Sequence, residues 1–239
     1  MVQFSNSIGY ISSGQLGIYV ACILLSASIS SLCSGHVADT ISRKYGILTG
    51  GLIVAVGTII SASANSFPAL ICARLITGVG QGQSISVVTI YLCEIAPQNI
   101  RGTVATMLQL LITIGIAAGY FIAYGSSKLD GSLAWRIPFI VEACVATTLS
   151  IGMIFMPFSP RWLVQHGRFQ EARVVLSRLR QTTENVNEEL HSIRGSLEEE
   201  GIQQARFSEV FSKRYIRRSL LGIFLMGFEM LCGVCVYLP

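Results

Sequence analysis

The chain has 239 residues, of which 51% are hydrophobic and 13% are charged, and its mean hydropathy is +0.60. This apolar content is more than one water-soluble domain of this length can bury, so it excludes an ordinary soluble protein and indicates a helical protein in a lipid bilayer. The formal net charge of +4 does not indicate nucleic-acid binding, because the basic residues lie beside apolar spans rather than on one basic face.

Six apolar windows follow one another along the chain, each close to the length of about twenty residues that crosses the hydrocarbon core. The windows are 15–38, 45–65, 69–95, 103–124, 137–156 and 219–238. They predict an all-α, polytopic membrane protein with six transmembrane helices. Between the last two windows, apolar residues at helical spacing, such as Ala172 and Leu176, predict short amphipathic helices in a charged segment.

The positions of lysine and arginine predict the orientation of these helices. Arg43, Lys44, Arg101 and the 159–218 segment are expected in the cytoplasm. The first span then runs from outside to inside, and residues 1–14 form an extracellular-side tail without a cationic start or a cleavage site. We therefore expect a helix upstream of this chain, which would make the chain a fragment or a truncated form of a larger protein.

Two pairs of glycines have the spacing of close helix packing. Gly78 and Gly82 are four residues apart, as are Gly115 and Gly119 in the next window, so each pair predicts a small face that a neighbouring helix can approach. Sliding along such a face would serve a moving bundle, and simple packing is the alternative.

Charged residues gather at the predicted cytoplasmic ends of the spans: Asp39, Arg43, Lys44, Glu94 and Arg101. Opposite charges on neighbouring helix ends pair when that side is closed and separate when it opens, so these residues are candidates for a gate. The alternative is a solvated set that only determines topology, since an exposed ion pair contributes about 0–1 kcal/mol. Arg74, near the outer end of its window, is a candidate for the opposite gate.

Two windows contain a polar side chain at a depth where burial in lipid is costly. Gln109 lies within 103–124, and three residues follow it at helical spacing: Ile112, Thr113 and Ile116. An amide beside aliphatic side chains suits the hydroxyls and the apolar face of a sugar, and an interhelical hydrogen bond is the alternative. Glu229, in the last window, is a lone carboxylate that would take up a proton rather than stay charged. These five residues are the candidate substrate-binding residues.

Three motifs stand at spacings typical of one family of membrane proteins. The first comprises Ile76, Gly78, Gly80, Gly82, Tyr91, Glu94 and Arg101, preceded by Arg74. The second is Gly35-x-x-x-Asp39-x-x-Ser42-Arg43-Lys44, with serine where the family has glycine. The third is 157–163, with Phe158 where the family has glutamate. Together they resemble the sugar porter family of the major facilitator superfamily, with its facilitated sugar transporters of insects and other eukaryotes, over helices two to seven of twelve.

This resemblance implies a domain organisation and a function. Residues 1–14 would be the tail, 15–158 helices two to six of the N-terminal half, 159–218 a cytoplasmic helical bundle, and 219–239 helix seven of a truncated C-terminal half. The implied function is transmembrane transport of a sugar or a similar small polyol by alternating access, facilitated or proton-coupled. The charged residues above would form the gates, and Gln109 would contact the sugar.

The resemblance also implies the partners of the protein. The substrate would be a hexose, a disaccharide or a polyol, and the other partners would be the lipid bilayer of the plasma membrane and the remainder of a transporter, with no nucleic acid. We expect no cofactor, no metal site and no enzymatic activity, because the sequence contains no catalytic constellation.

The 228–235 run departs from the family pattern. Two glutamines and an asparagine of the family are absent, and Glu229, Met230 and Cys235 stand in the aligned run. This departure leaves open a different substrate, or a non-transporting membrane subunit or sensor derived from a sugar transporter.

Overall fold

The computed structural model describes residues 12–129, 131–180, 183–202 and 216–229. The regular elements in these ranges are all helices: α2 (Ser13–Ile41), α3 (Arg43–Ser63), α4 (Phe67–Ile95), η1 (Gln98–Ile100), α5 (Arg101–Ser127), α6 (Leu133–Phe155), α7 (Pro160–Gln165), α8 (Phe169–Leu179), α9 (Thr183–Ile202) and α10 (Ile216–Glu229). The chain divides into two compact units, Met1–Leu190 and His191–Pro239, and the helical bundle belongs to the first.

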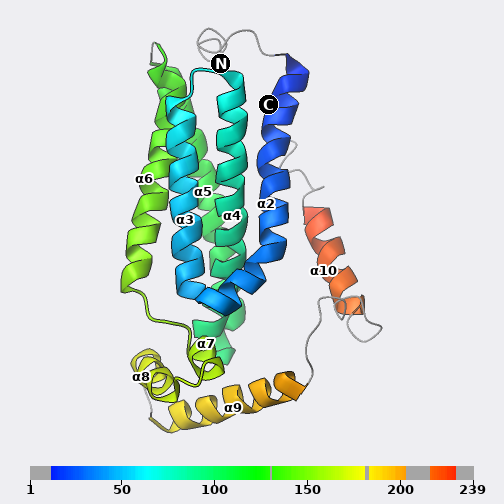
Figure 1. The fold of residues 1–239 in the computed structure, drawn as a ribbon, viewed down its shortest axis with the longest axis vertical. Coiled ribbons are helices and arrows are strands. Elements are labelled where there is room, and N and C mark those ends of the chain that lie inside the picture. The colour runs from blue at the N-terminus through cyan, green and yellow to red at the C-terminus, as the bar shows by residue number, and fades with distance from the viewer. Residues whose placement is uncertain (1–11, 130, 181–182, 203–215, 230–239) are drawn as a thin grey trace. The chain divides into compact units, whose positions relative to one another are not determined.

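Helix α4 lies at the centre of this bundle. It packs along α2 on one side and along α3 on the other, and α6 packs against α3 (Figure 1). Helix α5 packs against α6 and, less extensively, against α4. The short helices α7 and α8 pack on each other beyond the end of the bundle (Figure 1).

The start of α2 is set by a capping box. The backbone N–H of Ser12 donates to Oε1 of Gln15 at 3.0 Å, and the N–H of Gln15 donates to Oγ of Ser12 at 3.4 Å. These two bonds satisfy N–H groups that a helix start leaves without partners. Helix α2 therefore begins at Ser13, so the last residues of the expected outer tail are helical.

Glycines let α4 approach both of its neighbours. A Cβ on Gly82 would overlap the carbonyl oxygen of Ala27 in α2, and one on Gly78 would lie 2.6 Å from the carbonyl oxygen of Ile23. A Cβ on Gly80 would lie 2.6 Å from the carbonyl oxygen of Gly50 in α3. The predicted close packing at Gly78 and Gly82 is therefore confirmed, with α2 as the partner helix.

The second glycine pair has a different environment. A Cβ on Gly115 or Gly119 would meet nothing within 4 Å in the described part of the chain. All residues from 111 to 120 of α5 are exposed. The expected packing face on α5 thus has no described helix against it.

Four of the described helices are long and apolar enough to cross a membrane: α2, α3, α5 and α6. Two of the six expected spans, 69–95 and 219–238, stay predictions. Helix α4 has 29 residues, but its glycines, serines and glutamines lower its hydropathy, as suits a helix with protein on two sides. In the last window, α10 has 14 residues, and residues 230–238 lie outside the described ranges.

Gly82→Ala should destabilise the bundle, because the added methyl group would overlap the backbone of Ala27 and force α2 and α4 apart. We expect the free energy of unfolding to fall by about 1–3 kcal/mol, the usual cost of overpacking. Unfolding by SDS in lipid–detergent micelles, followed by circular dichroism, measures this change. Gly115→Ala is the matched control and should not lower the stability. Equal losses in both variants would contradict the packing described here.

Candidate functional site

A buried arginine joins the ends of three helices. Arg43, the first residue of α3, has 6% of its side chain exposed. Its Nε donates to the Glu94 carboxylate of α4, at 3.0 Å to Oε2 and 3.2 Å to Oε1. Its Nη2 lies 2.9 Å from Oδ1 of Asp39 in α2, and its Nη1 donates to the carbonyl oxygen of Ala38 at 3.1 Å. The guanidinium therefore holds the C-terminal ends of α2 and α4 at the start of α3.

Ser159 and Trp162, which follow α6 in the chain, complete this cluster. Oγ of Ser159 donates to Oε2 of Glu94 at 2.5 Å and accepts the backbone N–H of Trp162 at 3.4 Å. Nε1 of Trp162 donates to the carbonyl oxygen of Asp39 at 3.1 Å. We name Asp39, Arg43, Glu94, Ser159 and Trp162 the Arg43 junction. The structure thus brings together three of the predicted gate residues, and it adds two that the sequence analysis did not assign to a gate.

The turn before Arg43 is strained. Ser42 has φ 113° and ψ 145°, a region that a residue with a side chain adopts only at a steric cost. The residue is fully buried, and its Oγ has no hydrogen-bond partner among the described residues. Serine stands here where the motif of the family that the sequence resembles has glycine. Because the turn links Asp39 to Arg43, the strain is held within the junction.

The other two residues predicted for the cytoplasmic gate do not belong to the junction. Nζ of Lys44 donates to the carbonyl oxygen of Ile154 near the end of α6, at 2.8 Å, where a cation is favoured by the helix dipole. Arg101 is the first residue of α5, is exposed, and makes no ion pair within the described ranges. The gating roles of Lys44 and Arg101 stay predictions.

The predicted outer-gate residue, Arg74, lies between aromatic rings. Its Cζ is 4.5 Å from the ring centroid of Tyr19 in α2 and 5.3 Å from that of Phe139 in α6. Glu142 of α6 interacts electrostatically with Arg74, whose Nε is buried without a hydrogen-bond partner in the described part of the chain. Arg74 therefore links α2, α4 and α6 within the bundle, and its gating role stays a prediction.

The predicted substrate-binding residues of α5 share one exposed face: Gln109, Ile112, Thr113 and Ile116. Oγ1 of Thr113 donates to the carbonyl oxygen of Gln109 at 3.0 Å. Glu229 ends α10 in the other unit, and its side chain lies outside the described part of the structure, as do Met230 and Cys235. The structure thus places four of these residues on one surface and does not place the Glu229 side chain.

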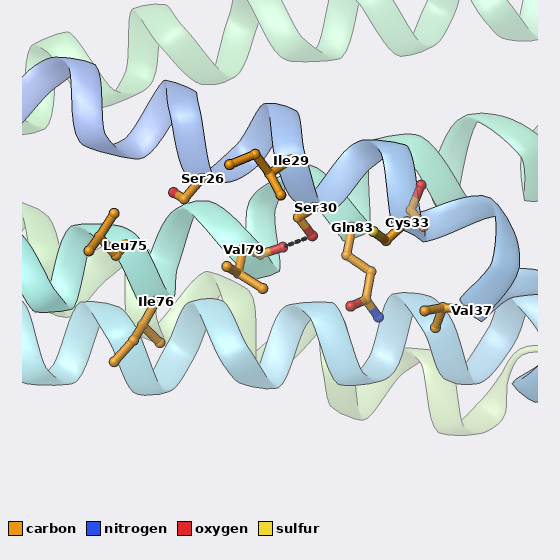
Figure 2. A pocket seen from close by; sticks show the side chains of 10 residues that line it. Ser26, Ile29, Ser30, Cys33, Val37, Leu75, Ile76, Val79 and Gln83 are labelled. Atoms are coloured by element: carbon orange, nitrogen blue, oxygen red, sulfur yellow. Dashed lines mark hydrogen bonds between the residues drawn. The ribbon is translucent and has the colours of Figure 1, made fainter.

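A groove of about 550 Å³ lies between α2 and α4 (Figure 2). Oγ of Ser30 donates to the carbonyl oxygen of Val79 at 2.6 Å, and Nε2 of Gln83 donates to the carbonyl oxygen of Gly46 in α3 at 2.8 Å. Two further serines of the groove bond to carbonyl oxygens of α2 itself. The rest of the lining is mainly apolar: Ile29, Val37, Leu75 and Ile76. Since its polar groups are already bonded to backbone, this groove suits hydrocarbon better than the hydroxyls of a sugar.

Arg180, just after α8, ties α8 and α9 to the end of α4. Its Nη1 and Nη2 both donate to the carbonyl oxygen of Ile95, each at 3.2 Å. The same guanidinium forms two bonds of 2.8 Å with the carboxylate of Glu189 in α9. Because Ile95 follows Glu94, any movement of the α4 end must move or break the Arg180 contacts. The sequence analysis did not single out this residue.

The fold is similar to half of a known type of transporter. The partially occluded, inward-open structure of the xylose transporter XylE from E. coli matches with a TM-score of 0.76 and 21% identity, over 83% of this chain and 53% of that chain. The proton:xylose symporter XylE bound to 6-bromo-6-deoxy-D-glucose matches with a TM-score of 0.75 and 23% identity, over 86% of this chain and 46% of that chain. The bundle is thus a partial major facilitator fold.

Sequence comparison assigns the chain to a family. The family described as "Sugar (and other) transporter" matches residues 2–239, and the chain belongs to this family. It is 35% identical to the arabinose-proton symporter of Escherichia coli (strain K12) over 90% of this chain, and 34% identical to the MFS glucose transporter mfs1 of Aspergillus flavus over 95%. The chain is thus a multi-pass membrane protein of a family of transporters rather than enzymes.

The chain matches only part of the length of these relatives. The chain spans 44% of the length of the arabinose-proton symporter and 46% of that of the glucose transporter.

Glu94→Gln should weaken the Arg43 junction, because it removes the more deeply buried of the two carboxylates that pair with a guanidinium of 6% exposure. Removing one member of a buried ion pair costs about 3 kcal/mol, which we expect as the loss in free energy of unfolding measured by SDS titration. Glu171→Gln is the matched control, since Glu171 pairs with Arg168 at side-chain exposures of 52% and 43% and should lose little. Equal effects of the two substitutions would contradict the buried pair.

Ser42→Gly should stabilise the protein, because glycine adopts the positive φ of this turn without steric cost. We expect a gain of about 1 kcal/mol, the relief of strain less the greater entropy of glycine in the unfolded chain. The control is Ser34→Gly, at a buried position inside α2, where glycine should cost about 1 kcal/mol. Thermal unfolding of both variants in the same micelles tests whether the two substitutions change the stability in opposite directions. A loss of stability in Ser42→Gly would contradict the strained turn.

Proposed function

We propose that the protein to which this chain belongs moves a sugar or a similar small polyol across a membrane by alternating access, the geometry described in general for major facilitator transporters. The observation that carries the proposal is the Arg43 junction, which ties the ends of α2, α3 and α4 to the segment after α6 around the almost completely buried pair of Arg43 and Glu94. Membership of the sugar transporter family supports it.

The energetics of the junction suit a gate. An ion pair removed from water gains Coulomb energy but has lost the hydration of both charges, so its net contribution is small compared with either term. Removing Glu94 alone leaves the buried Arg43 with only the half-exposed Asp39 as an ionic partner, which is costly. If the helix ends separate instead, water hydrates both side chains. The same residues therefore support a closed state and an open state of comparable free energy.

For the substrate, we propose the α5 face of Gln109, Ile112, Thr113 and Ile116. The amide and the hydroxyl supply hydrogen-bonding groups, and the isoleucines supply an apolar wall for a sugar ring. Relatives of the chain include an arabinose-proton symporter and a glucose transporter. Glu229 is proposed as a further contact that takes up a proton. The same proposal includes six membrane spans, which adds α4 and the last window to the four helices described above. It also includes a location in the plasma membrane.

A second candidate function is a non-transporting membrane subunit or sensor. The observation in its favour is the 228–235 run, where Glu229, Met230 and Cys235 stand in place of amides that a hexose would use.

Gln109→Ala in the full-length protein should raise the KM for sugar uptake about ten-fold or more, because each lost hydrogen bond to a bound polar group leaves an unmet partner worth about 1–3 kcal/mol. Uptake of labelled arabinose, xylose and glucose into proteoliposomes gives KM and the maximal rate. Leu111→Ala is the matched control, since at about 100° per residue it lies on the opposite face of α5 and should leave KM unchanged.

An unchanged KM in the Gln109→Ala variant would remove this residue from the site. Failure of the wild-type protein, shown to be correctly inserted, to take up any of the three sugars would favour the non-transporting subunit.

A further inference from the structure

We infer that Phe158 is a positioning residue of the proposed gate, which holds the start of α3 to the α7–α8 segment by cation–π and ring-stacking contacts beside the Arg43 junction. This inference rests on the proposed function for the meaning of the gate. Its contacts, however, are independent of the substrate, and they can be tested without transport.

Phe158 lies in the short connection between α6 and α7, and aromatic rings from both sides meet it. Its ring stacks on that of Trp162, with centroids 5.7 Å apart and an interplanar angle of 19°. The ring of Tyr45, in the first turn of α3, meets it edge to face at 5.7 Å and 66°. Trp162 in turn stacks on His166 at 4.1 Å. The ring of Phe158 is therefore the bridge between α3 and the aromatic side chains of α7.

Two cations share the same ring. Nζ of Lys44 lies 5.0 Å from the Phe158 centroid, and Cζ of Arg168 lies 5.6 Å from it. Lys44 belongs to α3, whereas Arg168 precedes α8, so the ring draws together two cations from segments far apart in sequence. Both distances fall within the range of about 6 Å in which an aromatic face attracts a cation. The ring therefore offsets part of the repulsion between these like charges.

The residues on either side of Phe158 are fixed as well. The carbonyl oxygen of Pro157 accepts a hydrogen bond from the hydroxyl of Tyr91 in α4 at 2.7 Å, and Ser159 donates to Glu94 at 2.5 Å. Three consecutive residues therefore contact α4, then α3, then α4 again. Contacts of both neighbouring residues hold the Phe158 ring in place, as expected of a positioning residue rather than of an apolar filler.

This chemistry differs from that of an exposed ion pair in its response to salt. An exposed ion pair weakens as the Debye length falls with rising ionic strength. A cation–π contact needs no carboxylate, and leucine in place of Phe158 would keep apolar volume but lose the attraction. Glutamate in its place would form ion pairs with Lys44 and Arg168 that depend on salt.

Hydrogen exchange of the full-length protein in lipid nanodiscs, followed by mass spectrometry at about 0.05 M and about 0.5 M NaCl, tests the inference. Phe158→Leu should raise exchange in peptides covering 157–168 about five- to thirty-fold, the effect of losing two contacts of this kind. Phe158→Tyr, which keeps the ring, should stay at the wild-type level. Phe158→Glu should be protected at low salt and lose that protection at high salt.

Phe155→Leu is the matched control, because the Phe155 ring is 82% exposed one turn earlier and should not affect exchange in 157–168. Lys44→Met supplies a second test, since it should also raise exchange in 157–168. In the double variant with Phe158→Leu, the two effects on this exchange should be less than additive.

Three results would overturn the inference: wild-type exchange in Phe158→Leu, exchange in Phe158→Tyr as fast as in Phe158→Leu, or fully additive effects of Lys44→Met and Phe158→Leu. If Phe158→Leu unfolds the bundle, exchange across 47–58 rises as well. Lys44→Met alone then decides, and unchanged exchange in 157–168 of that variant would overturn the inference. A protein that fails to transport sugar leaves all these readouts intact, so failure of the proposed function is a separate result.

Discussion

A guanidinium with only 6% of its side chain exposed has to be matched by acceptors, and the helix ends around Arg43 are arranged to supply them. Glu94 and Asp39 provide the charge, and the carbonyl oxygen of Ala38 takes a further N–H. Ser159 then satisfies a carboxylate oxygen that already faces the arginine. The positions of α2, α3, α4 and the segment after α6 at this end of the bundle all follow from one buried charge.

The glycines of α4 are what permit this arrangement at the helix ends. Gly78 and Gly82 bring α4 against the backbone of α2, and Gly80 brings it against α3. Helices held this closely leave little room for long side chains between them, so charged groups are placed where the helices end. The close packing along α4 and the cluster at its end are therefore two parts of one geometry.

Much of the bundle is readable from the residues, and the exceptions have physical reasons. Windows of apolar residues predict α2, α3, α4, α5 and α6, because a helix with a lipid-facing surface carries apolar side chains over most of it. Helix α4 has a lower hydropathy than the others because it packs against helices on two sides. For the junction, opposite charges at helix ends indicate Asp39, Arg43 and Glu94. Ser159 and Trp162 have no such signal, since a hydroxyl or an indole N–H has many potential partners and these contacts join residues 65 and 123 positions apart.

The formal charges beside the strained turn have an electrical consequence. Arg43 and Lys44 are positive, Asp39 and Glu94 are negative, and the four cancel. Moving one elementary charge through the whole membrane potential involves about 2.3 kcal/mol per 100 mV. A rearrangement that carries these four side chains together does no net electrical work. Under the proposed function, the membrane voltage would then act on such a movement only through the substrate, an accompanying proton or other charges of the protein.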